Sequence, residues 1–193
     1  AANKSVTADT VTTQFAANGK DISHTVAAGN AQLVISPLAP SENNYQTTVN
    51  APKFDCEFFP AGSDPKTCIA ATSVKTVRVP TQPAADRGTQ TLTSDKLIAN
   101  FDAGSRELAA LEATGNAKFN ERDRNGTSEK ITYSTADQTV RLRGGSPNVW
   151  DSKARAKAPE IDWNTRDEVS ELRGGASTTY YSVSNTGGAA PFA

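Results

Sequence analysis

The sequence predicts an all-β protein built of repeated pairs of short strands, and three observations support this fold class. Apolar and polar residues alternate over short runs, which is the period of a strand with one face covered. Turn-forming residues are frequent, with 13 Gly and 10 Pro, while only 36% of the residues are hydrophobic. The third observation is an internal duplication. No apolar run approaches the roughly 18 to 20 residues of a membrane-spanning helix.

The duplication aligns residues 5–34 with residues 91–120 without a gap, at an offset of 86. Eight of the 30 aligned positions are identical. These identities include the pairs Asp9/Asp95, Phe15/Phe101, Gly29/Gly115, Asn30/Asn116 and Ala31/Ala117. The chain therefore contains two related halves.

A shorter repeat lies within the halves. The stretches VTADTVTTQF, VNAPKFDCEF, TSDKLIANF, TSEKITYST and KAPEIDWNT each place small and polar residues before an alternating apolar run. The first apolar residues of these five rungs are Val11, Phe54, Leu97, Ile131 and Ile161. On the period of two, the same face continues through Phe15, Phe58, Phe101, Tyr133 and Trp163. Five rungs thus present an apolar stripe on one face.

Each rung is expected to consist of a first leg, a turn and a returning leg. AANGK, DAGSR, TADQ and TRDE carry turn residues after the first leg, and Asn125-Gly126 is interpreted as a hairpin turn. Two returning legs end in LRGG and two contain GNA, and these glycines fit bends at which the next rung begins. The best helical alternative is Ser105–Thr114, but its aligned partner GKDISHTVAA is a poor helix former, so a strand is favoured.

Cys56 and Cys68 flank a turn between Pro60 and Pro65, so they can meet across a hairpin. A disulfide is favoured because the composition is typical of extracytoplasmic proteins, and two unrelated buried thiols are the alternative. Two Cys and one distant His cannot complete a four-ligand zinc site, so no metal is expected.

The residues of a catalytic site are missing. The single histidine, His24, aligns with Ala110, and no motif of nucleophilic catalysis or nucleotide binding occurs. Acids recur where the rungs begin, as Asp9, Asp95 and Glu129, which favours a structural role at a corner over paired glycosidase carboxylates. A net charge of −1 with dispersed charges argues against nucleic acid as a partner. We expect neither enzymatic activity nor a cofactor.

The rungs resemble the OstA-like repeats of the LptA family, which includes LptA, LptC and the periplasmic domain of LptD. The resemblance is carried by LTSDKLIANF with EATGNAKF, by TSEKITYSTADQTVRLRGG and by ARAKAPEIDWNTRDEVSELRGGA. It covers residues 91–180, and residues 5–58 through the duplication. Residues 59–90 depart from the pattern.

The resemblance implies an elongated antiparallel β-jelly-roll folded over like a taco, whose apolar interior binds the acyl chains of lipopolysaccharide. It implies a periplasmic protein, either separate or part of a longer anchored one. The implied partners are lipopolysaccharide and, through head-to-tail strand addition, other OstA-like domains or a second copy of the chain. The expected lipid-binding residues are the stripe and four residues of the returning legs: Val11, Phe15, Phe54, Phe58, Leu97, Phe101, Leu111, Phe119, Ile131, Tyr133, Leu142, Ile161, Trp163 and Leu172.

The expected domain organisation is one elongated domain over residues 1–185, with halves at about 5–58 and 91–180 joined by a Cys-containing insertion. Residues 186–193 are expected to be a linker or disordered tail. Two other functions remain open. A structural or adhesive β-solenoid or sandwich would use the same stripe as a closed core, and a carbohydrate-active β-helix would need converging acids on one face.

Overall fold

A computed structural model describes residues 2–41, 44–60, 62–82, 87–167 and 169–181, and these residues form one antiparallel sheet of 14 strands. The predicted all-β fold is correct. The first strands are β1 (Ala2–Thr7), β2 (Thr10–Phe15), β3 (Ile22–Pro37), β4 (Tyr45–Phe58), β5 (Pro65–Pro80), β6 (Gln90–Phe101) and β7 (Leu108–Glu121). The others are β8 (Arg124–Ser134), β9 (Thr139–Arg143), β10 (Asn148–Trp150), β11 (Ala154–Lys157), β12 (Glu160–Asn164), β13 (Val169–Arg173) and β14 (Ser177–Tyr180). The described part of the chain holds no helix long and apolar enough to cross a membrane.

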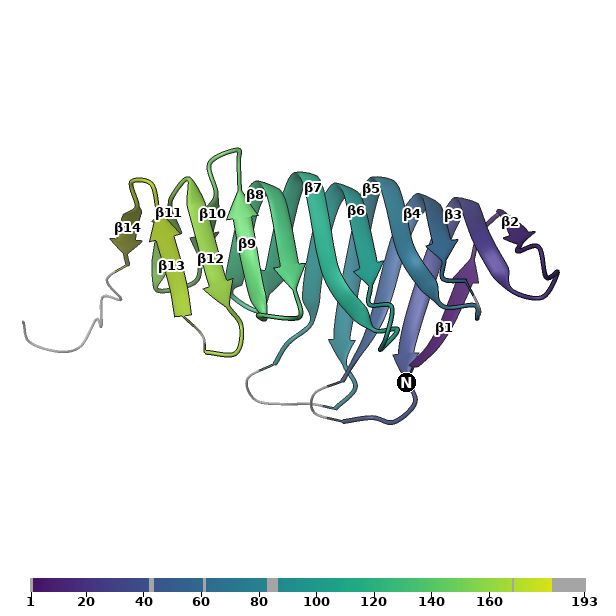
Figure 1. The fold of residues 1–193 in the computed structure, drawn as a ribbon. Coiled ribbons are helices and arrows are strands. Elements are labelled where there is room, and N and C mark those ends of the chain that lie inside the picture. Colours follow the sequence, from purple (N-terminus) through teal and green to yellow (C-terminus); the bar gives the residue numbers. More distant parts are fainter. Residues whose placement is uncertain (1, 42–43, 61, 83–86, 168, 182–193) are drawn as a thin grey trace, which may run out of the picture.

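The sheet is elongated and folded over along its length (Figure 1). β3 pairs with β2 through its first half and with β1 through its second half. β8 likewise pairs with both β9 and β10. The long strands β3 to β8 therefore run through both sides of the fold. We call the side that ends in β2 and β13 the β2/β13 wall, and the side that ends in β1 and β14 the β1/β14 wall.

The line along which the long strands bend is called the crease here, and register shifts mark it. The pairing of β3 with β4 shifts between Ala28 and Ala31, and that of β7 with β8 shifts between Thr114 and Ala117. An extra residue in one strand bends that strand and increases its twist. Repeated shifts at the same level therefore fold the whole sheet into two facing walls.

The repeated acids explain the local geometry at the crease. Gly29 and Gly115 both have φ of +77°, where glycine is favoured, and the following Asn30 and Asn116 are also left-handed. The side-chain amide of Asn116 donates a hydrogen bond of 3.0 Å to Asp95, and that of Asn30 does the same to Asp9. Asp9 and Asp95 thus have the structural corner role that the sequence predicted, through hydrogen bonds from asparagine side chains.

The core lies between the walls. One continuous row of register partners crosses the β2/β13 wall: Val11, Ala27, Phe54, Ala70, Leu97, Ala113, Ile131, Leu142, Ile161 and Leu172. The eight central members are at most 6% exposed. Ala31, Val49, Ala51, Val74 and Ala117 are buried on the facing wall. The predicted stripe is therefore the inward face of one wall.

Two local interpretations can be compared with the structure. Residues 108–121 form β7, so the strand favoured over a helix for this region is correct. The hairpin turn predicted at Asn125-Gly126 is wrong, because the turn lies at Arg122 and Asp123 and both predicted turn residues belong to β8. Within the atypical residues 59–90, β5 joins the sheet between β4 and β6. The tail predicted for residues 186–193 lies outside the described residues.

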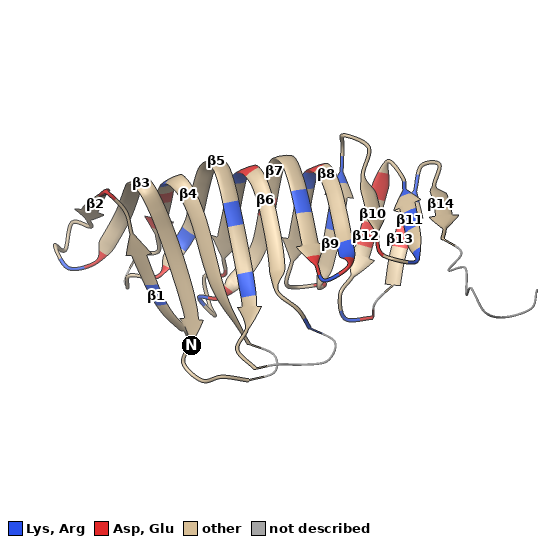
Figure 2. Cartoon of the chain, turned by 180° about the vertical axis from the view of Figure 1, so that it is seen from behind, with Lys and Arg blue, Asp and Glu red and all other residues tan. Residues whose placement is uncertain are grey.

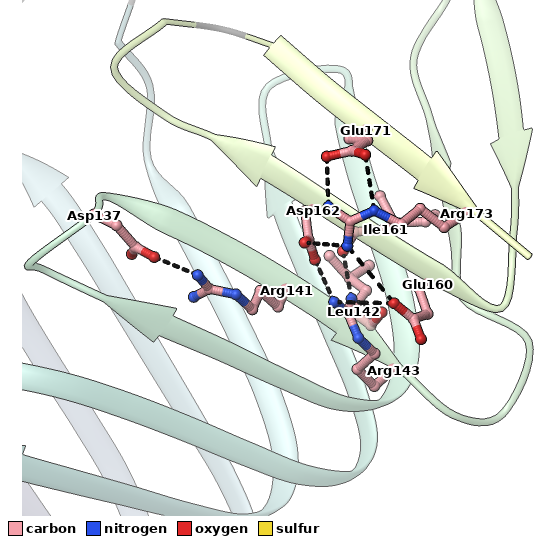
Figure 3. A network of polar contacts seen from close by, with 9 residues as sticks. All are labelled: Asp137, Arg141, Leu142, Arg143, Glu160, Ile161, Asp162, Glu171 and Arg173. Atoms are coloured by element: carbon pink, nitrogen blue, oxygen red, sulfur yellow. Dashed lines mark hydrogen bonds and ion pairs between the residues drawn. The ribbon is translucent and has the colours of Figure 1, made fainter.

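Basic and acidic residues are interspersed over the walls rather than gathered in one patch (Figure 2). At the β13 end they form a network on the outer face of β9, β12 and β13 (Figure 3). Arg143 and Arg173 donate to the two oxygens of Asp162, at 2.5 and 3.2 Å. The hydrogen bond from Arg173 also holds the pKa of Glu171 below its usual value. This cross-strand network stabilises the register of three short strands.

Candidate functional site

The interior between the walls is the candidate site, and it contains a cavity toward the C-terminal end of the sheet. A cavity of about 300 Å³ opens there between the two walls. The β2/β13 wall contributes Ile131, Val140, Leu142, Ile161 and Trp163. The facing wall contributes Phe119, Gly126, Val149, Ala154 and Ala156 among others. The lining is mainly aliphatic and aromatic, which is typical of sites for apolar ligands.

Register explains why these residues share the cavity. Leu92, Phe119, Gly126, Val149 and Ala156 are successive partners across β6, β7, β8, β10 and β11. Register partners project from the same face of a sheet, so this row faces inward together. Gly126 has no side chain, and a Cβ added there would lie 3.4 Å from Leu142 of the opposite wall. The glycine therefore leaves space that any larger residue would fill.

Five of the 14 expected lipid-binding residues line this cavity, namely Phe119, Ile131, Leu142, Ile161 and Trp163. The aromatic rings of Phe119 and Trp163 face one another from opposite walls, with centroids 6.2 Å apart. Leu111 and Tyr133 are register partners in the next inward row, and Leu172 pairs with Ile161. The structure thus brings together residues that the sequence assigned to different rungs and returning legs.

The remaining expected residues lie nearer the N-terminal end. Phe54 and Leu97 are buried against small residues of the core. Phe58 and Phe101 are half-buried near the ends of their strands. Val11 and Phe15 lie on β2, the end strand of its wall, and are 49% and 60% exposed. They therefore line the open end of the fold rather than its covered interior.

The predicted disulfide joins Cys56 of β4 to Cys68 of β5, which are direct register partners. It belongs to the same inward row as Ala99, Leu111 and Tyr133. The bridge therefore lies on the interior face and not on the outer surface. Among the described residues, no group of three or more His, Cys, Asp or Glu side chains is placed to hold a metal ion.

Sequence reasoning missed several cavity residues, including Val140, Val149, Ala154 and Ala156. Val140 is the register partner of both Tyr133 and Trp163, so the period of two on β9 already places it with Leu142. Val149 and Ala156 belong to short strands whose sequences do not match the repeated sequence of the rungs. Only the pairing of β10 with β8, and of β11 with β10, shows that they face the cavity.

The interior between the walls has the lining of a site that can shelter an apolar chain. The cavity is bounded by two walls that join at the crease. Within the described residues, no strand pairing joins the two walls at their edges away from the crease. The edge of the β2/β13 wall away from the crease is formed by loops such as those after β2 and β8 (Figure 1).

Comparison with known proteins gives the family. Residues 84–184, more than half of the chain, match the family described as "LptA/(LptD N-terminal domain) LPS transport protein". The crystal structure of LptH from Pseudomonas aeruginosa, described as the LptA homologous periplasmic component of the lipopolysaccharide transport device, is 10% identical. The alignment covers 92% of this chain and 94% of that chain, with a TM-score of 0.37. No curated protein matches the sequence significantly.

The family match begins just before β6 and includes all strands from β6 to β14. The first half is linked to the second by its own geometry, because the Asp9, Gly29 and Asn30 corner has the same contacts as the Asp95, Gly115 and Asn116 corner. The resemblance predicted from the repeated rungs is thereby confirmed: the chain belongs to the family of LptA and LptD N-terminal domain lipopolysaccharide transport proteins.

Proposed function

We propose that this protein binds lipopolysaccharide in the periplasm and transports it by holding its acyl chains between the two walls, without catalysing a reaction. The cavity lined by Phe119, Leu142, Ile161 and Trp163 supports this proposal most directly. Membership of a lipopolysaccharide transport family agrees with it. The Cys56–Cys68 bridge also agrees, because disulfides persist in oxidising compartments such as the periplasm.

The energetics of the proposal are those of apolar burial. Each methylene group removed from water contributes about 0.8 kcal/mol. An acyl chain that lies against the inward rows therefore gains binding free energy without a specific polar contact. Apolar burial is also non-directional, so a chain can slide from one position to the next. The proposed single elongated domain, made of two related halves, would provide such a path along its length.

Head-to-tail assembly is a further part of the proposed function. β1 and β2 form one end of the sheet, and β13 and β14 form the other (Figure 1). Edge strands present unpaired backbone groups that can accept another strand. Inward-facing Val6 and Val11 are exposed at the first end, and Tyr180 is 79% exposed at the second. Joining unlike ends of two copies, or of related domains, would cover this apolar surface and extend the groove.

Photo-crosslinking tests the lipid site. A photoreactive residue at Phe119, which lines the cavity, is expected to form an adduct with lipopolysaccharide. The matched control is the adjacent Lys118, which is exposed and alternates to the outer face of the same strand. Adducts of equal yield at both positions would contradict binding in the groove, as would failure of the lipid to displace a hydrophobic dye from the unmodified protein.

Cysteine crosslinking between copies tests the assembly. Thr12→Cys on β2 and Val169→Cys on β13 place thiols on outer faces of the two opposite end strands. A short bifunctional thiol reagent should join a Thr12→Cys copy to a Val169→Cys copy far more efficiently than two copies of the same variant. Dominance of same-variant products would refute the head-to-tail arrangement while leaving the lipid site untouched.

A further inference from the structure

A row of cations faces the groove along the edge of the β1/β14 wall that lies away from the crease. Register pairing runs through Lys4, Ile35, Thr47, Arg78, Gln90, Glu121 and Arg124 on β1 and β3 to β8. This row shares the face of buried Val49, which lies two residues from Thr47 on β4. The side chains of the row therefore project toward the opposite wall. We call it the rim row.

Each cation of the rim row lies over an aromatic ring. The Lys4 ammonium is 5.5 Å from the centroid of Phe101, and the Arg124 guanidinium is 5.9 Å from that of Trp163. Both rings belong to the opposite wall, so these contacts cross the open side of the groove. Cation–π contacts of this kind at exposed sites are worth only about 0.5 to 1 kcal/mol. A stronger anionic partner can therefore replace the ring.

Arg78 lies in the middle of the row, 4.4 Å from the Tyr45 ring, and donates a 2.8 Å hydrogen bond to Gln90. Its side chain remains accessible to solvent, yet the surrounding protein removes enough water to lower the pKa of the guanidinium. Burial likewise raises the pKa of Tyr45. Within the groove, a charge of opposite sign is thus screened less by water than it would be on the outer surface.

Two polar groups accompany the cations. Glu121 is the single acid of the row, 8% exposed, and accepts hydrogen bonds from Gln90 and from the backbone amide of Gly88. Thr76 lies two residues from Arg78 on the same face, is 7% exposed, and its hydroxyl has no hydrogen-bond partner among the described residues. With three cations and one acid, the rim row carries a net positive charge. Three of the inward residues on the opposite wall, Phe101, Tyr133 and Trp163, are aromatic.

We propose that the rim row binds the phosphate groups of a lipid whose acyl chains lie in the groove below it. This proposal rests on the proposed function and adds to it the recognition of the head group. A phosphate monoester carries a charge of about −1.5 to −2 at pH 7 and three acceptor oxygens. Arginine forks bind such groups through paired hydrogen bonds. An apolar interior with cations at its open edge matches an amphipathic molecule with an anionic head.

The experiment compares a phosphorylated lipid A with the same lipid after its phosphates are removed, using displacement of a hydrophobic dye. The test variant combines Lys4→Gln, Arg78→Gln and Arg124→Gln. The control combines Lys75→Gln, Lys96→Gln and Lys118→Gln, which changes the net charge equally but alters exposed residues that alternate to the outer faces of β5, β6 and β7. Circular dichroism checks that both variants keep the sheet.

The test variant is expected to bind the phosphorylated lipid about tenfold more weakly and the dephosphorylated lipid unchanged, whereas the control keeps the preference for phosphate. Replacing Arg78 and Arg124 by Lys retains the charge and should preserve most of that preference. Equal weakening toward both lipids would overturn the phosphate site while leaving lipid binding intact. If inorganic phosphate without a lipid binds tightly, the rim row is a site for free phosphate, and the proposal that it binds a lipid head group is wrong. Failure of the unmodified protein to bind either lipid would instead count against the proposed function.

Discussion

The ring of Phe119 on β7 faces the ring of Trp163 on β12 across the interior, with 6.2 Å between their centroids and an interplanar angle of 55°. These two strands are not neighbours in the sheet, so the contact joins the two walls rather than adjacent strands. Tilted aromatic pairs at this separation are favourable beyond their buried area. The pair therefore couples the walls where the cavity opens.

A double-mutant cycle on this pair is expected to show coupling. Phe119→Leu and Trp163→Leu should each lower the free energy of unfolding, with an interaction energy of about 0.5 to 1.5 kcal/mol between them. Urea unfolding of the four proteins measures it. A second cycle of Phe119→Leu with Phe58→Leu, from the distant β4, should be additive. Additivity in the first cycle would show that the walls are not coupled by these rings.

Filling the cavity from Gly126 should reduce lipid binding without unfolding the protein. Gly126 does not have a positive φ, and its added Cβ would meet Leu142 and Val149 at 3.4 and 3.6 Å, which is ordinary contact. Gly126→Leu is therefore expected to weaken displacement of a bound hydrophobic dye by lipopolysaccharide about tenfold. Thr127→Leu, on the outer face of the same strand, is the control. If Gly126→Leu leaves the affinity for lipopolysaccharide unchanged, the lipid does not bind in this cavity.

The inward stripe could be predicted from the sequence because alternation fixes the face of a strand. Ile131, Leu142 and Ile161 carry this signal in three strands that turn out to be adjacent. Which wall a residue belongs to follows from its position relative to the crease. Phe119 and Leu111 lie on the same strand but on opposite walls, because the bend at Gly115 and Asn116 separates them.

The position of the turn before β8 and the exposure of individual stripe residues could not be predicted from the sequence. They depend on which strands pair, and not on the conformational preference of single residues. Asn125-Gly126 has the composition of a hairpin turn. In the structure, Gly126 pairs with Phe119 and Val149, and this pairing places the turn earlier, at Arg122 and Asp123. The exposure of Phe15 likewise depends on β2 being an end strand, which no residue pattern specifies.

The Cys56–Cys68 disulfide is expected to contribute to stability. It closes a loop with a sequence separation of 12, and the change to Ala at both positions should lower the free energy of unfolding by about 2 to 3 kcal/mol. Urea unfolding measures the change. Intact mass after alkylation, with and without reduction, checks the bridge independently. Two thiols that alkylate fully without reduction would refute it.

Acid stability should depend on Asp55. The ring Nε2 of His24 lies 2.7 Å from the Asp55 carboxylate, and this hydrogen bond lowers the pKa of Asp55. Because the folded pKa lies below the unfolded value of about 3.9, the stabilisation is present above that pH and is lost as pH falls through the folded pKa. Asp55→Asn should therefore destabilise the protein at pH 6, and the difference should shrink below about pH 4.

Thermal unfolding at pH 6 and at pH 3 measures the difference in stability between Asp55→Asn and the unmodified protein. Glu57→Gln removes an exposed carboxylate from the same strand and serves as the control. A penalty for Asp55→Asn that stays constant from pH 6 to pH 3 would show that the ionised carboxylate is not what stabilises this contact.

The free energy of unfolding should depend on the size of the side chain at position 115, which lies at the crease. Gly115 has φ of +77°, and a Cβ added there would lie 2.7 Å from the Asp95 Cβ and closer still to its carboxylate. Gly19 also has a positive φ, of +65°, but a Cβ there would meet no atom within 4 Å. Comparing the two positions separates steric overlap from backbone strain.

Gly19→Ala should lower the free energy of unfolding by about 1 kcal/mol, from backbone strain alone. Gly115→Ala should cost about 2 kcal/mol or more, because the Asp95 side chain must move and its hydrogen bond from Asn116 is lost as well. In an Asp95→Gly background the extra cost of Gly115→Ala should disappear, since both the overlapping Cβ and the carboxylate of Asp95 are gone. Equal losses for Gly115→Ala in both backgrounds, measured by urea unfolding, would show that the acid is not packed against the bend.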